Sequence, residues 1–142
     1  MMAKQIKHEF FFPHPPAVVW DYLTKPGLMA QWLMPNDFEP VVGHQFRFTA
    51  GPVPQLEFDG IVYCTVLEIV PLKKLVYSWK CGPGGGVIKV DSLVTWQLYS
   101  KENGTQLVLD HNGLKEADFA MYSAMNDGWL KNVQKITALI NS

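Results

Sequence analysis

The sequence predicts an α+β fold in which a curved antiparallel sheet of about six strands packs on a long C-terminal helix, with two short helices after the first strand. Three observations predict it. Between residues 45 and 111, apolar residues alternate with polar ones, as half-buried strands require. After Asn112-Gly113 the apolar period changes to three and four, which is typical of a helix. Eleven glycines and ten prolines exclude a helical bundle.

The composition adds a first indication of function. The 142 residues fit a single domain, 1–142, and no repeat or linker divides them. Charged residues make up only 18% of the chain, whereas five Trp, five Tyr and eight Phe give 18 aromatic residues. That number exceeds what a small core filled mainly by Leu, Ile and Val needs. The sequence therefore indicates a domain that encloses something apolar.

Charge and targeting signals exclude several classes of partner. The net charge is -1, the lysines are scattered, and Arg47 is the single arginine, so a nucleic-acid footprint is absent. The polar N-terminus lacks a secretory signal, and no apolar run reaches the ~18 residues of a membrane span. We expect a cytoplasmic protein without nucleic-acid or membrane partners. Cys64 and Cys81 lack zinc-site spacing, so we expect free thiols and no metal ligands.

The first third of the chain predicts one strand and two short helices. Lys4 to Phe12 alternates and then becomes continuously aromatic, and Pro13 ends this strand. Pro15-Pro16 suits a first helical turn, and the helix ends before Lys25-Pro26. Gly27 to Leu33 forms a second short helix.

The middle of the chain predicts an antiparallel meander. Gly60 gives the longest strand a bend, and the Asn103-Gly104 pair marks a hairpin turn. If Val70 pairs with Leu75 across the turn that joins their strands, Cys64 lies opposite Cys81. The expected strands are one around Phe46 and Phe48, then Leu56 to Val70, Leu75 to Cys81, Val87 to Tyr99 and Thr105 to His111.

The last segment predicts one long helix. About 24 residues would span roughly 36 Å at 1.5 Å per residue, which is enough to cross a whole sheet. The apolar residues at its helical spacing are Phe119, Tyr122, Met125 or Asn126, Trp129, Val133, Ile136 and Ile140.

This order of elements is that of the helix-grip fold, in which a curved sheet wraps a long helix around a ligand cavity. The sequence resembles the START-like (SRPBCC) superfamily, and specifically the branch named after the activator of the heat-shock-protein-90 ATPase. The resemblance covers nearly the whole chain. Six motifs carry it: Pro15 to Asp21, Pro26 to Leu33, Val66 to Pro71 with Leu75 to Trp79, Gly104 to Leu107, His111 to Leu114, and Gly128-Trp129.

The chain departs from the family pattern in two places. The family usually shows a paired glycine where this sequence has Val42-Gly43-His44, and the Gly82 to Gly86 loop is richer in glycine than usual. The eukaryotic co-chaperone also carries a separate N-terminal domain, so we do not expect a chaperone partner here. The wider superfamily contains cyclases and hydratases, which implies an enzyme as a further alternative.

The candidate binding residues are the apolar side chains expected to face one another across the fold. Aromatic rings with polar tips, together with adaptable methionines, are the usual lining of a small apolar pocket. The alternative is that they simply pack as a core, because proteins bury such residues anyway. The set comprises Trp32, Phe46, Phe48, Tyr77, Trp79, Trp96, Leu109, His111, Met121, Met125 and Trp129.

The polar side chains in and next to this set offer limited chemistry. His111 ends a strand on the apolar face, where it could anchor a ligand, act as an acid or base, or be a hydrogen-bonded core histidine. Alternation places Arg47 opposite Phe46 and Phe48, on the solvent side. Neither a P-loop nor a nucleophile elbow is present. We therefore assign no catalytic residue, cofactor or metal.

The sequence as a whole predicts binding of a small hydrophobic or aromatic molecule between the C-terminal helix and the sheet. Burial against Trp79, Trp96, Met125 and Trp129 would hold it, with Tyr77 or His111 providing orientation. Two alternatives remain: a protein-interaction module similar to the co-chaperone domain, and an enzyme of the cyclase or hydratase type. A homodimer is also open at this stage.

Overall fold

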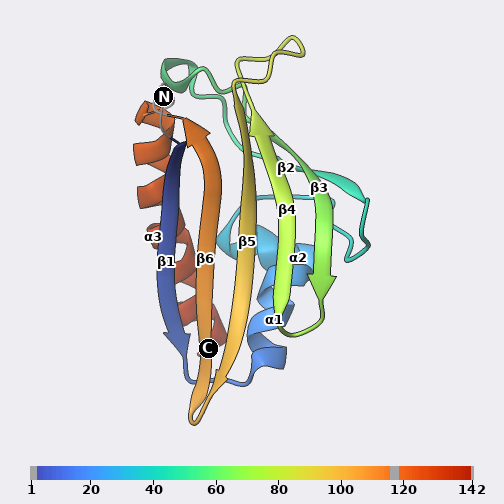
Figure 1. Cartoon of the computed structure of the whole chain (residues 1–142), viewed down its shortest axis with the longest axis vertical. Helices are drawn as coiled ribbons and strands as arrows, with labels where there is room; N and C mark the ends of the chain where they lie inside the picture. The colour runs from blue at the N-terminus through green and yellow to red at the C-terminus, as the bar shows by residue number, and fades with distance from the viewer. Residues whose placement is uncertain (1–2, 116–118, 142) are drawn as a thin grey trace.

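A computed structural model describes residues 3–115 and 119–141 and confirms the predicted fold class. Six antiparallel strands form one curved sheet in the order β1-β6-β5-β4-β3-β2, and the helices lie together on one of its faces (Figure 1). The elements are β1 (Ala3–Phe12), α1 (Pro16–Thr24), α2 (Pro26–Trp32), β2 (Gln45–Thr49), the short 3-10 helix η1 (Pro54–Leu56), β3 (Ile61–Val70), β4 (Lys74–Cys81), β5 (Val90–Lys101), β6 (Gly104–Lys115) and α3 (Phe119–Ile140).

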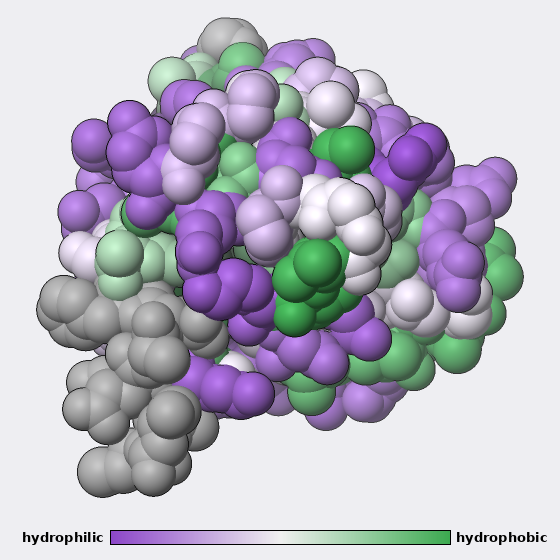
Figure 2. Space-filling view, turned by 90° about the horizontal axis from the view of Figure 1, so that it is seen from above, coloured by the Kyte–Doolittle hydropathy of each residue, from purple (hydrophilic) through white to green (hydrophobic). Residues whose placement is uncertain are grey.

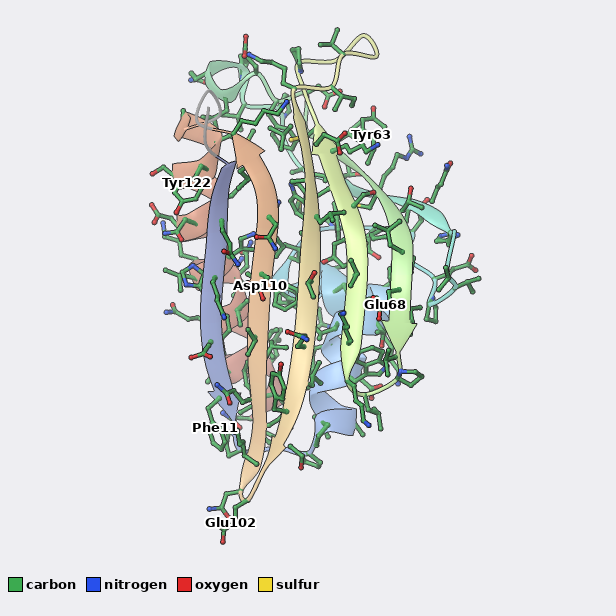
Figure 3. All side chains as sticks on the ribbon, viewed as in Figure 1. Phe11, Tyr63, Glu68, Glu102, Asp110 and Tyr122 are labelled. Atoms are coloured by element: carbon green, nitrogen blue, oxygen red, sulfur yellow. The ribbon has the colours of Figure 1, made fainter. Side chains whose placement is uncertain are left out.

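The two faces of the sheet differ in character. Tyr63, Glu68 and Asp110 point away from the helices in Figure 3, and each bears a polar group toward solvent. Glu68 forms an ion pair with Lys74, and Asp110 accepts a hydrogen bond from Gln5. The opposite face carries the apolar side chains, so the core lies between the sheet and the helices.

The strand predicted over Leu56 to Val70 is shorter than expected. Leu56 belongs to the short helix η1 (Pro54–Leu56), and β3 begins only at Ile61. Gly60 adopts a φ of 95°, and a Cβ there would lie 2.7 Å from the carbonyl oxygen of Ala50. The glycine therefore marks the start of the strand and not a bend inside it, because the backbone turns tightly against residue 50.

The predicted pairing of the two cysteines is wrong. Val70 pairs with Lys74, and a bulge between Val66 and Glu68 shifts the register by one further residue. Tyr63 pairs with Lys80, which places Cys64 beside Trp79 and not beside Cys81. Both cysteines are buried, and neither forms a disulfide.

The final hairpin is longer than the sequence indicates. The predicted turn is confirmed, since Lys101 pairs with Gly104. However, β6 does not end at His111 but continues to Lys115, and β5 begins at Val90 instead of Val87. Gly113 accommodates the extension because its φ of 96° lets the strand bulge opposite β1.

The two short helices pack together, and the second spans Pro26–Trp32, one residue earlier than the predicted Gly27 to Leu33. Pro16 and Pro26 are the first residues of α1 and α2, where the missing N–H groups cost no helical hydrogen bond. The indole nitrogen of Trp32 in α2 donates to the carbonyl oxygen of Tyr22 in α1 at 2.7 Å, which joins the two helices. Val133 and Ile136 of α3 are completely buried.

The end of the sheet that carries the β4–β5 loop faces the viewer in Figure 2. Hydrophilic side chains cover much of this surface, with hydrophobic ones gathered near its middle. The β4–β5 loop itself exposes Val87 and Ile88. No helix in the described part of the chain is both long and apolar enough to cross a membrane.

Candidate ligand-binding pocket

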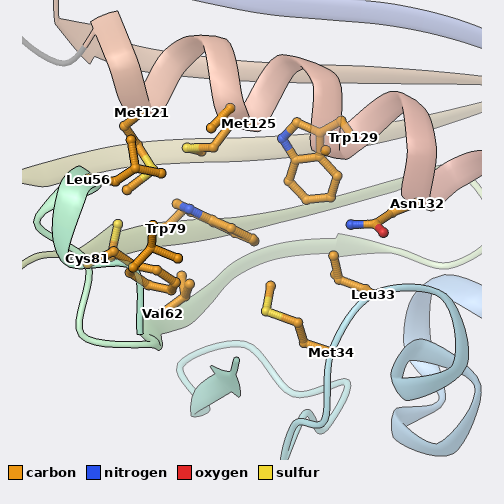
Figure 4. Close-up of a pocket in the computed structure, with 14 residues that line it drawn as sticks. Leu33, Met34, Leu56, Val62, Trp79, Cys81, Met121, Met125, Trp129 and Asn132 are labelled. Carbon is orange, nitrogen blue, oxygen red and sulfur yellow. The ribbon is translucent and has the colours of Figure 1, made fainter. Parts of the chain in front are cut away.

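A pocket of about 200 Å³ lies between the first half of α3, strands β3 and β4, and the loops that face them. Figure 4 shows α3 on one side and the sheet with the loop segments on the other. The described lining is almost entirely apolar. It comprises Leu33, Met34, Val53, Leu56, Phe58, Val62, Trp79, Cys81, Met121, Ala124, Met125, Gly128, Trp129 and Asn132.

One stripe of α3 forms a wall of the pocket. Met121, Met125, Gly128 and Asn132 follow one another at intervals of three or four residues, so they share a helical face. A Cβ placed on Gly128 would meet no heavy atom within 4 Å beyond its chain neighbours and its own helix backbone. The glycine therefore leaves open space on this face.

The opposite wall combines strand and loop residues. Val62 of β3 and Trp79 and Cys81 of β4 point inward because side chains alternate along each strand. Leu56 comes from η1 and Met34 from the segment after α2, and both are partly exposed. The pocket thus has a floor of regular sheet and a rim of irregular chain.

Two polar side-chain groups reach this apolar space. Asn132 forms no hydrogen bond with any described residue, and its carboxamide points from α3 toward the pocket in Figure 4. The indole nitrogen of Trp79 also has no hydrogen-bond partner among the described residues, although the residue is only 6% exposed. Both groups remain available to a bound molecule.

Beneath the pocket, His111 belongs to a buried chain of hydrogen bonds. Trp129 Nε1 can only donate, so the 3.0 Å contact makes His111 Nδ1 the acceptor. The neutral imidazole then carries its hydrogen on Nε2, which donates to Ser92 Oγ at 2.8 Å. Ser92 Oγ in turn donates to the carbonyl oxygen of Trp79 at 2.9 Å. Each hydrogen in this chain has one acceptor.

The direction of these hydrogen bonds decides whether Ser92 and His111 can act as a nucleophile and its base. A serine nucleophile would have to donate its hydroxyl proton to the histidine, whereas here the Ser92 hydroxyl donates to a backbone carbonyl. His111 has no exposed surface, and both ring nitrogens are occupied. The histidine therefore positions Trp129 and the adjacent strands.

Three ionisable side chains of the interior favour their uncharged forms. Burial lowers the pKa of His111 to about 3, because an imidazolium would lose its hydration there. Burial likewise raises the pKa of the Cys64 thiol and of the Tyr77 hydroxyl far above their ordinary values. At neutral pH the interior next to the pocket carries no charge on these three side chains.

The structure divides the predicted binding residues into two groups. Trp79, Met121, Met125 and Trp129 line the pocket. The other seven lie outside it, in the buried core: Trp32, Phe46, Phe48, Tyr77, Trp96, Leu109 and His111.

The core group is held by ring packing and internal hydrogen bonds. Phe46 and Phe48 contact each other edge to face, with centroids 5.3 Å apart, and both contact Tyr77. The Tyr77 hydroxyl accepts the indole hydrogen of Trp96 at 3.0 Å. Trp96 also packs edge to face on Trp32 at 5.9 Å. The polar atoms of these rings are thus already used inside the protein.

Several lining residues were not predicted from the sequence. Gly128 and Asn132 belong to the same helical stripe as Met121 and Met125, so the spacing in α3 could have identified them. The rim residues could not be found in this way. Leu56 was assigned to a strand that does not begin until Ile61, and no periodicity links it to α3.

Comparison with known proteins places the chain in a family. The sequence profile described as activator of Hsp90 ATPase homolog 1-like protein matches residues 13–141. The chain belongs to this family. The START-like resemblance inferred from the motifs is thereby confirmed. A comparison with curated proteins finds no match.

Solved structures share the fold of this family member. The protein MLL2253 of Mesorhizobium loti is 31% identical, with 97% of each chain covered and a TM-score of 0.87. BH1534 of Bacillus halodurans is 25% identical, with 99% of each chain covered and a TM-score of 0.76. CalU16 of Micromonospora echinospora is 22% identical over 97% of this chain and 76% of its own, with a TM-score of 0.75, and shows the same fold.

Proposed function

We propose that this protein binds a small, mainly apolar molecule in the pocket between α3 and the sheet. The observation that carries the proposal is the apolar pocket itself, a space of about 200 Å³ with no charged side chain in its described lining. Burial of apolar surface supplies the binding free energy, at roughly 25 cal/mol for each Å² removed from water.

The size of the pocket limits the ligand. An apolar cavity of about 150 Å³ is large enough for benzene, and drug-sized molecules occupy roughly 300–1,000 Å³. A space of about 200 Å³ therefore fits a molecule of one or two rings better than a whole lipid. The partly exposed rim lets such a molecule enter from solvent.

The predicted contacts divide into direct and indirect ones. Trp79, Met125 and Trp129 contact the ligand, since they line the pocket. Trp96 acts indirectly, because its ring packs against that of Trp129 with centroids 5.4 Å apart. His111 is a positioning residue as well, because it accepts the hydrogen bond that orients the Trp129 ring.

Binding can be tested with naphthalene as an apolar probe and two variants of one residue. Gly128→Ala adds a methyl group where there is room, whereas Gly128→Leu adds a side chain large enough to fill much of the pocket. Both replacements favour the helix, so both variants should fold. We expect naphthalene to shift the indole N–H resonances of Trp79 and Trp129 in the wild type and in Gly128→Ala. In Gly128→Leu the affinity should fall at least tenfold.

Two results would contradict the proposal. One is an absence of naphthalene binding to the wild type at its solubility limit, with the same absence for other one- and two-ring compounds. The other is equal binding by the wild type and Gly128→Leu, because the probe would then occupy another part of the protein.

The pocket lining favours binding over the enzyme alternative. A cyclase or hydratase needs a histidine or carboxylate in the cavity, and none is found among its described lining residues. The interaction module, the homodimer and the cytoplasmic location stay predictions.

A further inference from the structure

Trp79 differs from the other buried tryptophans in its hydrogen bonding. Trp32 donates to the Tyr22 carbonyl, Trp96 to the Tyr77 hydroxyl and Trp129 to His111. A buried indole N–H ordinarily finds such a partner. Trp79 is only 6% exposed and has none among the described residues, so its donor is the exception.

The position of the Trp79 nitrogen accounts for the exception. The described chain contains no fully buried side-chain nitrogen or oxygen without a hydrogen-bond partner. The Trp79 nitrogen must therefore retain accessible surface, and the space next to this ring is the pocket that it lines. Figure 4 shows the nitrogen on the side of the ring that faces Met125.

The charge of the surroundings restricts what can meet this donor. The described lining contains no Lys, Arg, His, Asp or Glu, and His111 beneath it is held neutral by burial. An ionised group would lose its hydration here without gaining a counter-charge, which is strongly unfavourable. A neutral acceptor atom gains a hydrogen bond from Trp79 at much lower cost.

We propose that the ligand is a neutral, flat molecule of one or two rings whose acceptor atom, a ring nitrogen or a carbonyl oxygen, receives the hydrogen of Trp79 Nε1. The inference rests on the proposed function and specifies the ligand class. The apolar body of the molecule lies against Met125 and Trp129. In Figure 4, Asn132 stands at the other end of the pocket from Met121, where its carboxamide meets a second polar substituent if the ligand has one.

Two pairs of probes of matched shape test this assignment. Quinoline and naphthalene differ in one ring nitrogen, and at pH 7.5 both are uncharged. One net hydrogen bond is expected to make quinoline bind about three- to tenfold more tightly. The neutral 2-naphthamide should bind at least tenfold more tightly than the anionic 2-naphthoate, which has nearly the same shape.

Variants connect the preference to one nitrogen. Trp79→Phe keeps a ring but removes the N–H group, so the ratio of quinoline to naphthalene affinity should fall to about one. Trp32→Phe removes an N–H group that the Tyr22 carbonyl accepts outside the pocket, and the ratio should persist there. The ratio is measured within each variant, which cancels changes in pocket size. In the wild type, naphthalene shifts the Trp79 indole proton only through its ring current, whereas quinoline should move that proton further downfield than naphthalene does.

The outcomes separate the two proposals. Equal affinities of the wild type for quinoline and naphthalene, or a preference that survives in Trp79→Phe, would overturn the acceptor assignment and leave apolar binding intact. Tighter binding of 2-naphthoate than of 2-naphthamide would overturn the proposal that the ligand is neutral. If no probe binds at all, the proposed function falls together with the assignment. If Trp79→Phe does not fold, the shift of the wild-type indole proton decides the question alone.

Discussion

The two halves of α3 face the same sheet but meet different surroundings. The second half buries Val133 and Ile136 completely. The first half presents Met121, Met125 and Gly128 to an open pocket of about 200 Å³. Trp129 lies at the boundary, with its ring centroid 5.4 Å from Trp96 on the packed side and 5.1 Å from Trp79 on the pocket side.

The difference comes from what lies opposite each half. At the packed end, α2 brings Trp32 against Trp96, so a large ring fills the space under the sheet. At the pocket end, η1 and the loop residues around it cover the sheet instead, and they supply smaller and partly exposed side chains. The comparison teaches that the binding space arises where irregular chain replaces a helix as the cover of the core.

The largest expected effect is a difference in the free energy of unfolding between one truncation in each half of α3. Ile136→Ala should lower the free energy of unfolding by about 2–4 kcal/mol, because it leaves a cavity in a closed core. Met125→Ala should cost about 1 kcal/mol or less, since part of its surface already faces the pocket. Urea denaturation of both variants and the wild type measures the difference. Equal losses would mean that the two ends are equally packed.

A pH profile tests how well the packed side excludes water. Folding lowers the pKa of His111 from 6.5 to about 3, so below pH 6.5 the unfolded chain binds a proton that the folded chain refuses. Stability should therefore fall as the pH decreases from 6.5 toward 3. Between pH 6 and pH 4 the wild type should lose stability more steeply than His111→Gln, by about 1 kcal/mol per pH unit. Denaturation curves at several pH values measure this slope.

The same profile can contradict the comparison. The two proteins share every other ionisable side chain, so only His111 contributes to the difference in slope. Parallel curves for the wild type and His111→Gln would show that the His111 side chain is as accessible to water as the pocket.

The smallest expected effect concerns stability at the pocket end. Gly128→Ala should raise the free energy of unfolding by about 0.5–1 kcal/mol, because alanine favours a helix interior and its methyl group has room. Thermal unfolding without ligand measures the gain. A loss of stability would mean that other side chains already fill the space beside Gly128, so that the first half of α3 is as closely packed as the second.

Much of the fold could be predicted from local sequence, but parts of the site could not. The strand alternation around Trp79 and the helical spacing from Met121 to Trp129 identified four residues of the pocket, because periodicity reports which face of an element is buried. Leu56 was missed because a 3-10 turn leaves no periodic pattern. The bulge after Val66 was missed for a similar reason, since one extra residue changes the register without changing the composition.

The sequence by itself determined the order of the elements, their buried faces and the family, because these depend on residue periods, prolines and short motifs along the chain. Only the tertiary structure decided which rings fill the core and which ones border a space. Tyr77 and Trp79 lie two residues apart on one strand face, yet the first accepts a hydrogen bond inside the core and the second faces the pocket. That distinction depends on the partners that other segments bring, and no local pattern records it.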